Sequence, residues 1–340
     1  DLLDSHPAFD ALGSGFLGSA RLRLVFGPEP ARTDTGAFIS AISYVNTRSS
    51  KRAVWGFEAV PSAGKDSQAA EKVFVPLWRS RHTGGALPTD RMDTGIAVVN
   101  PNDRPVTVIV DAFPTDNLDV SAQCRSVGPF SLLPVTIAPH SNHVFYQGPG
   151  TTDPFPDDCF GSAVVRTTQP GDTILAVVND AQNLRQLAAA YNAIPATQAH
   201  RELAVPLFRS LHGANHLTTG IQVMNVGERT ASMRIDFLAP LGPGAILIDG
   251  CGIACSALVP PMQSHTWYPP SIAAIGPNTV GSAIIFSSEP AVAVVMDVPM
   301  SGCCVDTAAY TAIPMFGVPM PGARPLVTKE RNRSIATFVP

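Results

Sequence analysis

The sequence contains the same series of short motifs twice, and this internal repeat constrains the fold more than any other feature. Four segments recur in the same order: residues 74–80 with 204–210, 94–100 with 219–225, 161–163 with 281–283, and 190–195 with 309–314. The copies lie about 120 residues apart, which is the size of a domain and far longer than the ~20–50-residue period of a solenoid. We therefore predict two tandem domains, at residues 72–196 and 202–318.

The two ends of the chain match parts of the same unit. The head matches only the back half, because residues 43–46 correspond to residues 176–179 and residues 59–61 to residues 193–195. In the tail, Phe338-Val339-Pro340 matches Phe74-Val75-Pro76, which opens a unit. We predict a partial domain at residues 1–63 and an extended tail at residues 319–340 that ends in a strand.

Each unit is predicted to be a series of short β-strands. The 340-residue chain has 32 prolines and 27 glycines, and proline disrupts helix interiors, so long helices are not expected. Segments rich in β-branched residues recur roughly every 8–12 residues between turn-forming residues, which is typical of a β-sandwich. The strands predicted in the first unit are residues 73–79, 94–100, 106–113, 131–137, 143–147, 161–168, 173–180 and 187–194. The turn signal at residues 169–172 predicts that the sixth and seventh strands form a hairpin.

The repeated motifs resemble the tandem immunoglobulin-like β-sandwich units of secreted and cell-surface bacterial proteins. The elements that carry the resemblance are Val75-Pro76-Leu77 and the segments 94–100, 139–146, 161–164 and 190–195. These are framework residues, and no catalytic residue is among them. The resemblance implies an all-β fold of tandem Ig-like antiparallel β-sandwiches, two complete and one partial at the N-terminus. It also implies an exported module without enzymatic activity.

The six cysteines lie where disulfides are expected. If strands alternate in direction, the connections after the third, fifth and seventh strands lie at one pole of a sandwich. Cys124 and Cys159 then share a pole of the first unit, and we predict a disulfide between them. The other four lie at the equivalent pole of the second unit: Cys251, Cys255, Cys303 and Cys304.

Two arrangements of these four cysteines are open. We favour two bridges that join Cys251 and Cys255 to Cys303 and Cys304. The rival is a Cys251–Cys255 bridge with a vicinal Cys303–Cys304 bridge. Free thiols and a thiolate metal site are further alternatives, but disulfides fit the pattern better and indicate an oxidising compartment.

The histidines recur at matching positions. His82 matches His212, and His143 matches His265. Recurrence in two divergent units favours a framework role, such as bonding a carbonyl or capping a turn, over a ligand-binding role.

An acidic cluster and two tryptophans are candidates for binding calcium and a sugar, respectively. Asp153, Asp157 and Asp158 could offer oxygens to calcium, but their spacing is not that of an EF-hand loop, so a solvated loop is expected. Trp78 and Trp267 align with phenylalanines of the other unit, which favours core packing over stacking on a sugar.

Several classes of function lack support in the sequence. The net charge is −4, which gives no electrostatic footprint for nucleic acid. No apolar run approaches the ~20 residues of a membrane span. The motifs of common hydrolases, metalloproteases and nucleotide-binding enzymes are absent, and no metal or cofactor is expected.

The ends of the chain suggest assembly. The segment Ile335-Ala336-Thr337-Phe338-Val339 alternates like a strand, and we predict that it adds to the partial first domain of a neighbouring copy. Such a head-to-tail contact propagates as a filament. The resulting hypothesis is an extracellular or cell-surface structural protein whose partner is itself or another surface protein.

Two alternatives stay open. The chain could be a carbohydrate-binding or adhesive cell-surface module, or a stalk fragment of a longer tandem-repeat protein. Asn332 begins a glycosylation sequon in the tail.

Overall fold

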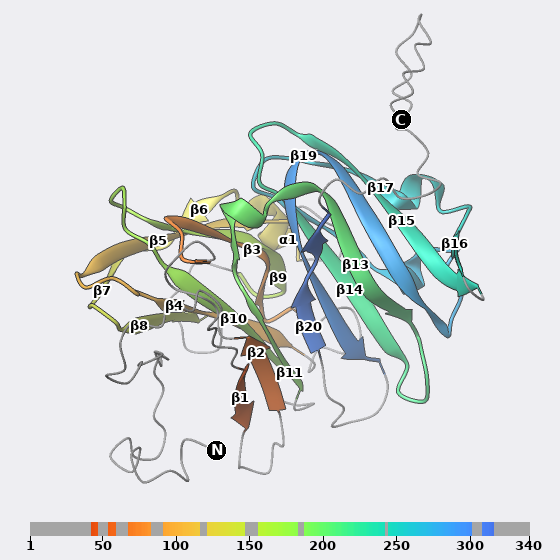
Figure 1. The fold of residues 1–340 in the computed structure, drawn as a ribbon, viewed down its shortest axis with the longest axis horizontal. Coiled ribbons are helices and arrows are strands. Elements are labelled where there is room, and N and C mark those ends of the chain that lie inside the picture. Colours follow the sequence, from red (N-terminus) through yellow and green to blue (C-terminus); the bar gives the residue numbers. More distant parts are fainter. Residues whose placement is uncertain are drawn as a thin grey trace, which may run out of the picture.

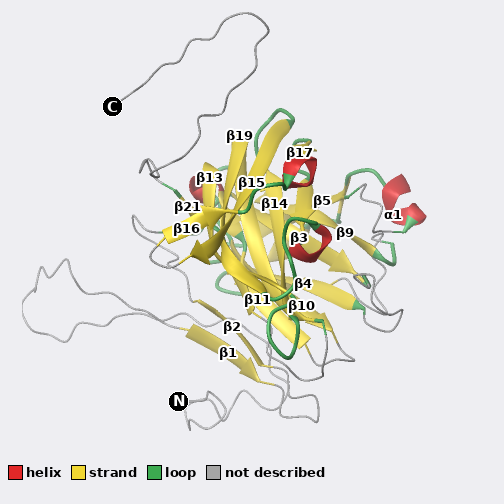
Figure 2. Cartoon of the chain, turned by 90° about the vertical axis from the view of Figure 1, so that its right-hand side faces the viewer, coloured by secondary structure: helices red, strands yellow, loops and turns green. Residues whose placement is uncertain are grey.

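The computed structural model describes residues 42–46, 54–58, 67–82, 91–115, 121–146, 156–182, 187–241, 244–300 and 308–315. Strands make up most of this part of the chain, and its helices are short (Figure 2). The longest of them, α1 (Ala122–Ser126), has five residues. The prediction of an all-β, antiparallel sandwich fold is confirmed.

The first unit contains two sheets. Its strands are β3 (Lys72–Ser80), β4 (Met92–Val99), β5 (Val106–Pro114), β6 (Phe130–Ser131), β7 (Val135–Ile137), β8 (Asn142–Tyr146), β9 (Cys159–Thr167), β10 (Leu175–Gln182), β11 (Leu187–Asn192) and β12 (Ile194–Pro195). One sheet has the order β11-β10-β4-β8, and the other has the order β12-β3-β9-β5-β6, with β7 also paired to β5. The predicted strand 131–137 is interrupted between β6 and β7, where Pro134 has no N–H to donate.

The second unit repeats this arrangement. Its strands are β13 (His200–Ser210), β14 (Leu217–Asn225), β15 (Ala231–Leu241), β16 (Gly244–Leu247), β17 (Ser256–Val259), β18 (Ser264–Trp267), β19 (Thr279–Pro299), β20 (Ala308–Thr311) and β21 (Ile313–Pro314). The short 3-10 helices η3 (Ala196–Gln198), η4 (Gly252–Cys255) and η5 (Pro269–Ser271) join or flank the strands. Apart from His200 and the bridge of Ala70 to Ile174, the pairings of β3 to β21 stay within the ranges predicted for the two units.

The predicted hairpin of the sixth and seventh strands is wrong. β9 pairs with β3 and β5, whereas β10 pairs with β4 and β11, so the chain passes from one sheet to the other between them. In the second unit the same passage occurs inside the single strand β19. Its residues 279–287 pair with β13 and β15, and residues 291–299 pair with β14 (Figure 1). A turn signal marks a change in chain direction but does not determine which sheet the next strand joins.

Each unit has an apolar core with matching aromatic residues. Trp78 and its counterpart Phe208 are both 0% exposed, and Trp267 is 1% exposed where Phe145 lies in the first unit. The prediction that Trp78 and Trp267 pack in cores is confirmed. The register shifts at the same place in both units, between Val75 and Trp78 in β3 and at the matching positions in β13.

A further hairpin precedes the two units. β1 (Ile42–Asn46) pairs antiparallel with β2 (Val54–Glu58), and β2 lies beside β11 (Figure 1). In turn, β11 lies beside β20, its counterpart in the second unit. The placement of β2 against β11 therefore repeats the placement of β11 against β20. The remainder of the predicted partial domain lies outside the described residues.

Glycine at position 281 is required by a close approach of two strands. A Cβ atom there would collide with the backbone oxygen of Leu238 and would lie 2.8 Å from the ring of Phe208. Gly161 meets the backbone of Phe113 in the same way. Recurrence of glycine at both places thus has a steric cause.

We expect Gly281→Ala to destabilise the protein by at least about 1–3 kcal/mol, because the added methyl group must push a strand backbone aside. The matched control is Gly220→Ala, whose Cβ would meet nothing within 4 Å. Urea denaturation measures both free energies of unfolding. An equal, small effect of the two substitutions would contradict the close approach.

Candidate functional site

The polar residues that recur in both units form hydrogen bonds and ion pairs inside each sandwich. The buried hydroxyl of Tyr191 donates to the backbone oxygen of Leu77 at 2.7 Å and accepts from its N–H at 3.4 Å. Tyr310 makes the same two contacts with Leu207. These phenols therefore clamp the irregular segment of β3 and of β13, where the strand register shifts.

Burial keeps these phenols in their donor form. It raises the pKa of Tyr191, and it raises the pKa of Tyr310 to about 12. Both side chains thus remain protonated over the whole physiological pH range. Neither is suited to act as a general base near neutral pH.

A second recurring group is an ion pair with a threonine. Asp180 lies between Arg79 and the hydroxyl of Thr94, which donates to Asp180 at 2.9 Å. The second unit has Asp297 between Arg209 and Thr219. Burial raises the pKa of Asp180 although Arg79 opposes this shift. Because the same triad occurs in both units and ties β3 to β4 and β10, we interpret it as structural.

The matched histidines make matching contacts in the two units. His82 and His212 form isolated backbone bridges, to Met92 and Leu217, that close the connection after the opening strand of each unit. The rings of His143 and His265 lie edge-on against the next aromatic residue of the strand, at centroid distances of 4.8 Å and 5.1 Å. The backbone bridges do not involve the imidazoles of His82 and His212, so the framework role of these side chains stays a prediction.

Two members of the acidic cluster contact basic or imidazole side chains. Asp157 forms ion pairs with Arg81 and Arg91, and Asp158 lies 3.1 Å from Nδ1 of His82. Asp153 lies outside the described residues. Among the described residues, no three His, Cys, Asp or Glu side chains are arranged to hold a metal ion.

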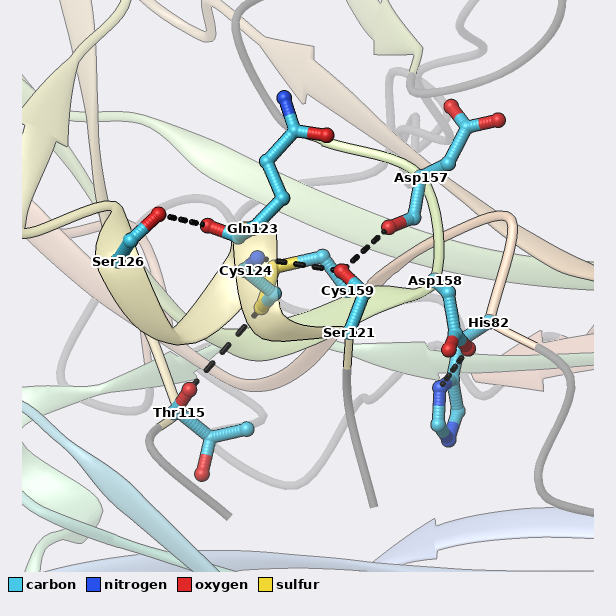
Figure 3. The surroundings of a disulfide bond; sticks show 9 residues. All are labelled: His82, Thr115, Ser121, Gln123, Cys124, Ser126, Asp157, Asp158 and Cys159. Carbon is cyan, nitrogen blue, oxygen red and sulfur yellow. Dashed lines mark hydrogen bonds and ion pairs between the residues drawn. A yellow bond between two sulfur atoms is a disulfide. The ribbon is translucent and has the colours of Figure 1, made fainter. Parts of the chain in front are cut away.

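The predicted Cys124–Cys159 disulfide is present. Cys124 lies on α1, whose first turn is capped by Ser121, and the bridge joins this helix to the start of β9 beside His82 and Asp158 (Figure 3). The hydroxyl of Ser121 also donates to the backbone oxygen of Asp157 at 3.0 Å. The disulfide and these contacts lock the connections at one pole of the first unit.

The favoured pairing of the other cysteines is wrong. Cys251 is bonded to Cys255, four residues along the chain, and their Cα atoms are 5.6 Å apart. The turn of η4 brings these two side chains together within one connection. The rival arrangement contained this bridge. Its second bridge, Cys303–Cys304, lies outside the described residues.

A hollow of about 160 Å³ lies beside this second disulfide. It is lined in part by Arg234, Asp236 and Asp249. Arg234 and Asp236 pair with each other at 3.0 Å, so their charges are balanced within the protein.

The two units make an apolar contact with each other. Phe74, Val164 and Ile194 of the first unit pack with Met224 and Val292 of the second, and all five are at most 4% exposed. We call this group the inter-unit cluster. In Figure 1 the two units lie side by side where these strands meet, β3 and β9 from one and β14 and β19 from the other.

Further contacts extend this interface. Val294 and Met296 of β19 belong to the core cluster of the first unit. The hydroxyl of Ser162 donates to the backbone oxygen of Met262 at 2.6 Å. Only residues 196–199 separate β12 from β13. Buried apolar contacts and a short connection therefore join the two sandwiches.

The repeated motifs do not predict the inter-unit cluster. A signal for it exists: residues 291–296 of β19 form an uninterrupted apolar run, which indicates a strand buried on both faces. The matching residues 174–180 alternate in burial and end in Asn179-Asp180. The predicted assembly strand, residues 335–339, lies outside the described residues.

Comparisons with known proteins do not identify a family. No family model and no curated protein matches the chain. A solved structure titled "Crystal Structure of Thermotoga maritima 1070" aligns with 35% of this chain and 97% of its own length, at 18% identity and a TM-score of 0.28. No helix of the described residues is long and apolar enough to cross a membrane.

We expect Tyr191→Phe to lower the free energy of unfolding by about 1–3 kcal/mol, because it leaves both backbone groups of Leu77 buried without a partner. The control is Tyr146→Phe, since Tyr146 is 39% exposed and water can replace its contacts. The control should change stability by less than about 0.5 kcal/mol. Chemical denaturation measures the free energy of unfolding of the natural chain and the two variants. Equal values for Tyr191→Phe and the natural chain would contradict the clamp.

Proposed function

We propose that this chain is a non-enzymatic structural protein of the cell exterior that associates with copies of itself through its C-terminal tail. The observation that carries the proposal is the inter-unit cluster, in which one sandwich covers the apolar outer face of the next. The recurring polar residues support the same proposal, because they stabilise strands and connections.

One residue of the inter-unit cluster has an exposed counterpart in the second unit. Ile194 is 3% exposed in the inter-unit cluster, whereas its counterpart Ile313 is 54% exposed. Pro76 is buried and its counterpart Pro206 is exposed. A chain that covers such a face internally and presents it again at its far unit is suited to side-by-side association.

The disulfides support a location outside the cytoplasm. Cys124–Cys159 and Cys251–Cys255 both form within single units, and such bridges persist mainly in oxidising compartments. The adhesive alternative has less support, because Trp78 and Trp267 lie in the cores and are not available to stack on a sugar.

The test compares the full chain with a chain truncated after Gly322, by negative-stain microscopy and light scattering. We expect filaments or large oligomers from the full chain and monodisperse particles from the truncated one. A full-length control with residues 335–339 replaced by glycine and serine keeps the length of the tail and should also fail to assemble. Monodisperse particles from the unaltered full chain would contradict the proposal.

A further inference from the structure

The outer face of the sheet β11-β10-β4-β8 is covered differently in the two units. In β19 the outward residues Val292, Val294 and Met296 are at most 2% exposed. The counterparts of these residues in β10 are Leu175, Val177 and Asn179. Ile221 and Ile96 occupy the same position of the repeat, and they pair with Val295 and Val178 respectively, which aligns β19 with β10. All three of these counterparts are only half-buried.

The neighbouring strand gives the same result. Met224 of β14 is 0% exposed, whereas its counterpart Val99 of β4 is half-buried. We call Val99, Leu175 and Val177 the β4–β10 outer face. It is an apolar surface whose equivalent in the second unit is completely covered.

The equivalent surface of the second unit is covered by the first unit. There β3 lies against β14 and β19, and Phe74 of β3 packs with Met224 and Val292. In the same interface β11 of the first unit lies beside β20 of the second. The equivalent contact one unit earlier is that of β2 with β11. By the same relation, a strand equivalent to β3 belongs over Val99 and Leu175.

One segment of the chain has the required sequence. Phe338-Val339-Pro340 repeats Phe74-Val75-Pro76, and residues 335–339 alternate as a strand does. These residues lie outside the described part of the chain. They carry the aromatic side chain that the repeated contact uses.

We propose that the β4–β10 outer face is the docking site for the C-terminal segment, residues 334–340, of a second copy of this chain. Phe338 then packs on Val99 and Leu175 as Phe74 packs on Met224 and Val292. The inference rests on the proposed function and assigns its contact to one surface. Apolar strand packing supplies the affinity, and the repeat supplies the register.

The experiment places a photoreactive benzoyl-phenylalanine at position 338 of the full chain. This chain is mixed with a ¹⁵N-labelled copy of the natural sequence, irradiated, and digested for mass spectrometry. We expect cross-links to ¹⁵N-labelled peptides that contain Val99 or Leu175. Cross-links only to unlabelled peptides would mean that the tail binds its own chain, and would overturn the assignment to a second copy.

The readout separates this inference from the proposed function. Filaments with cross-links to another surface, such as the region of Pro206 and Ile313, would overturn the docking site and leave assembly intact. Absence of both filaments and cross-links would overturn both.

A substitution gives an independent measurement. Leu175→Asp in the full chain should raise the concentration needed for assembly at least about tenfold, because a carboxylate would be buried under Phe338. The matched control is Leu258→Asp, an exposed leucine on β17 of the second unit, which should leave that concentration unchanged. Circular dichroism confirms that both variants fold. Equal assembly of the two variants would contradict the proposed site.

Discussion

The burial of β19 on both of its faces is the constraint on which the rest of the structure depends. A strand of a two-layer sandwich normally has one apolar face toward the core and one toward water, and it alternates accordingly. The second half of β19 does not alternate, because its outer face lies against the first sandwich. At roughly 25 cal/mol per Å² of apolar surface, exposing Met224, Val292 and their neighbours to water would be costly. The two sandwiches are therefore a single packed body.

The polar framework makes this apolar contact possible. Each opening strand is irregular between its valine and its buried aromatic residue, and the backbone groups freed there need partners. Tyr191 supplies them from β11, and Tyr310 supplies them from β20. With its irregularity fixed, β3 presents Phe74 on one side to the second unit and Trp78 on the other to its own core.

The sequence was sufficient to predict the all-β fold and the first disulfide. Strands are short-range features, and residues such as Val106–Val110 have the β-branched composition of a strand whatever surrounds them. Cys124 and Cys159 could be paired because the alternation of strand direction alone puts their two connections at the same end of the sandwich. The hairpin prediction was wrong because sheet membership is decided by long-range pairing, here of β9 with β3 and of β10 with β4.

The repeated closing motif alone does not predict the inter-unit cluster. Ile194 and Ile313 occupy the same motif, yet one is buried and the other is half exposed, since only the first has a sandwich packed against it. The Cys251–Cys255 pairing likewise depends on the local turn of η4, which the connection lengths do not reveal. For Ile194 the deciding contact comes from the neighbouring sandwich, whereas for Cys251 it comes from the turn that contains the cysteine.

The central claim is that the two sandwiches unfold as one body because of the inter-unit cluster. Trp78 and Trp267 lie in the first and second cores, so variants that keep only one tryptophan report on each unit separately. Denaturant titration followed by fluorescence should give coincident transitions for the two reporters. Two separate transitions, at different midpoints, would show that the sandwiches are independent and would contradict the account.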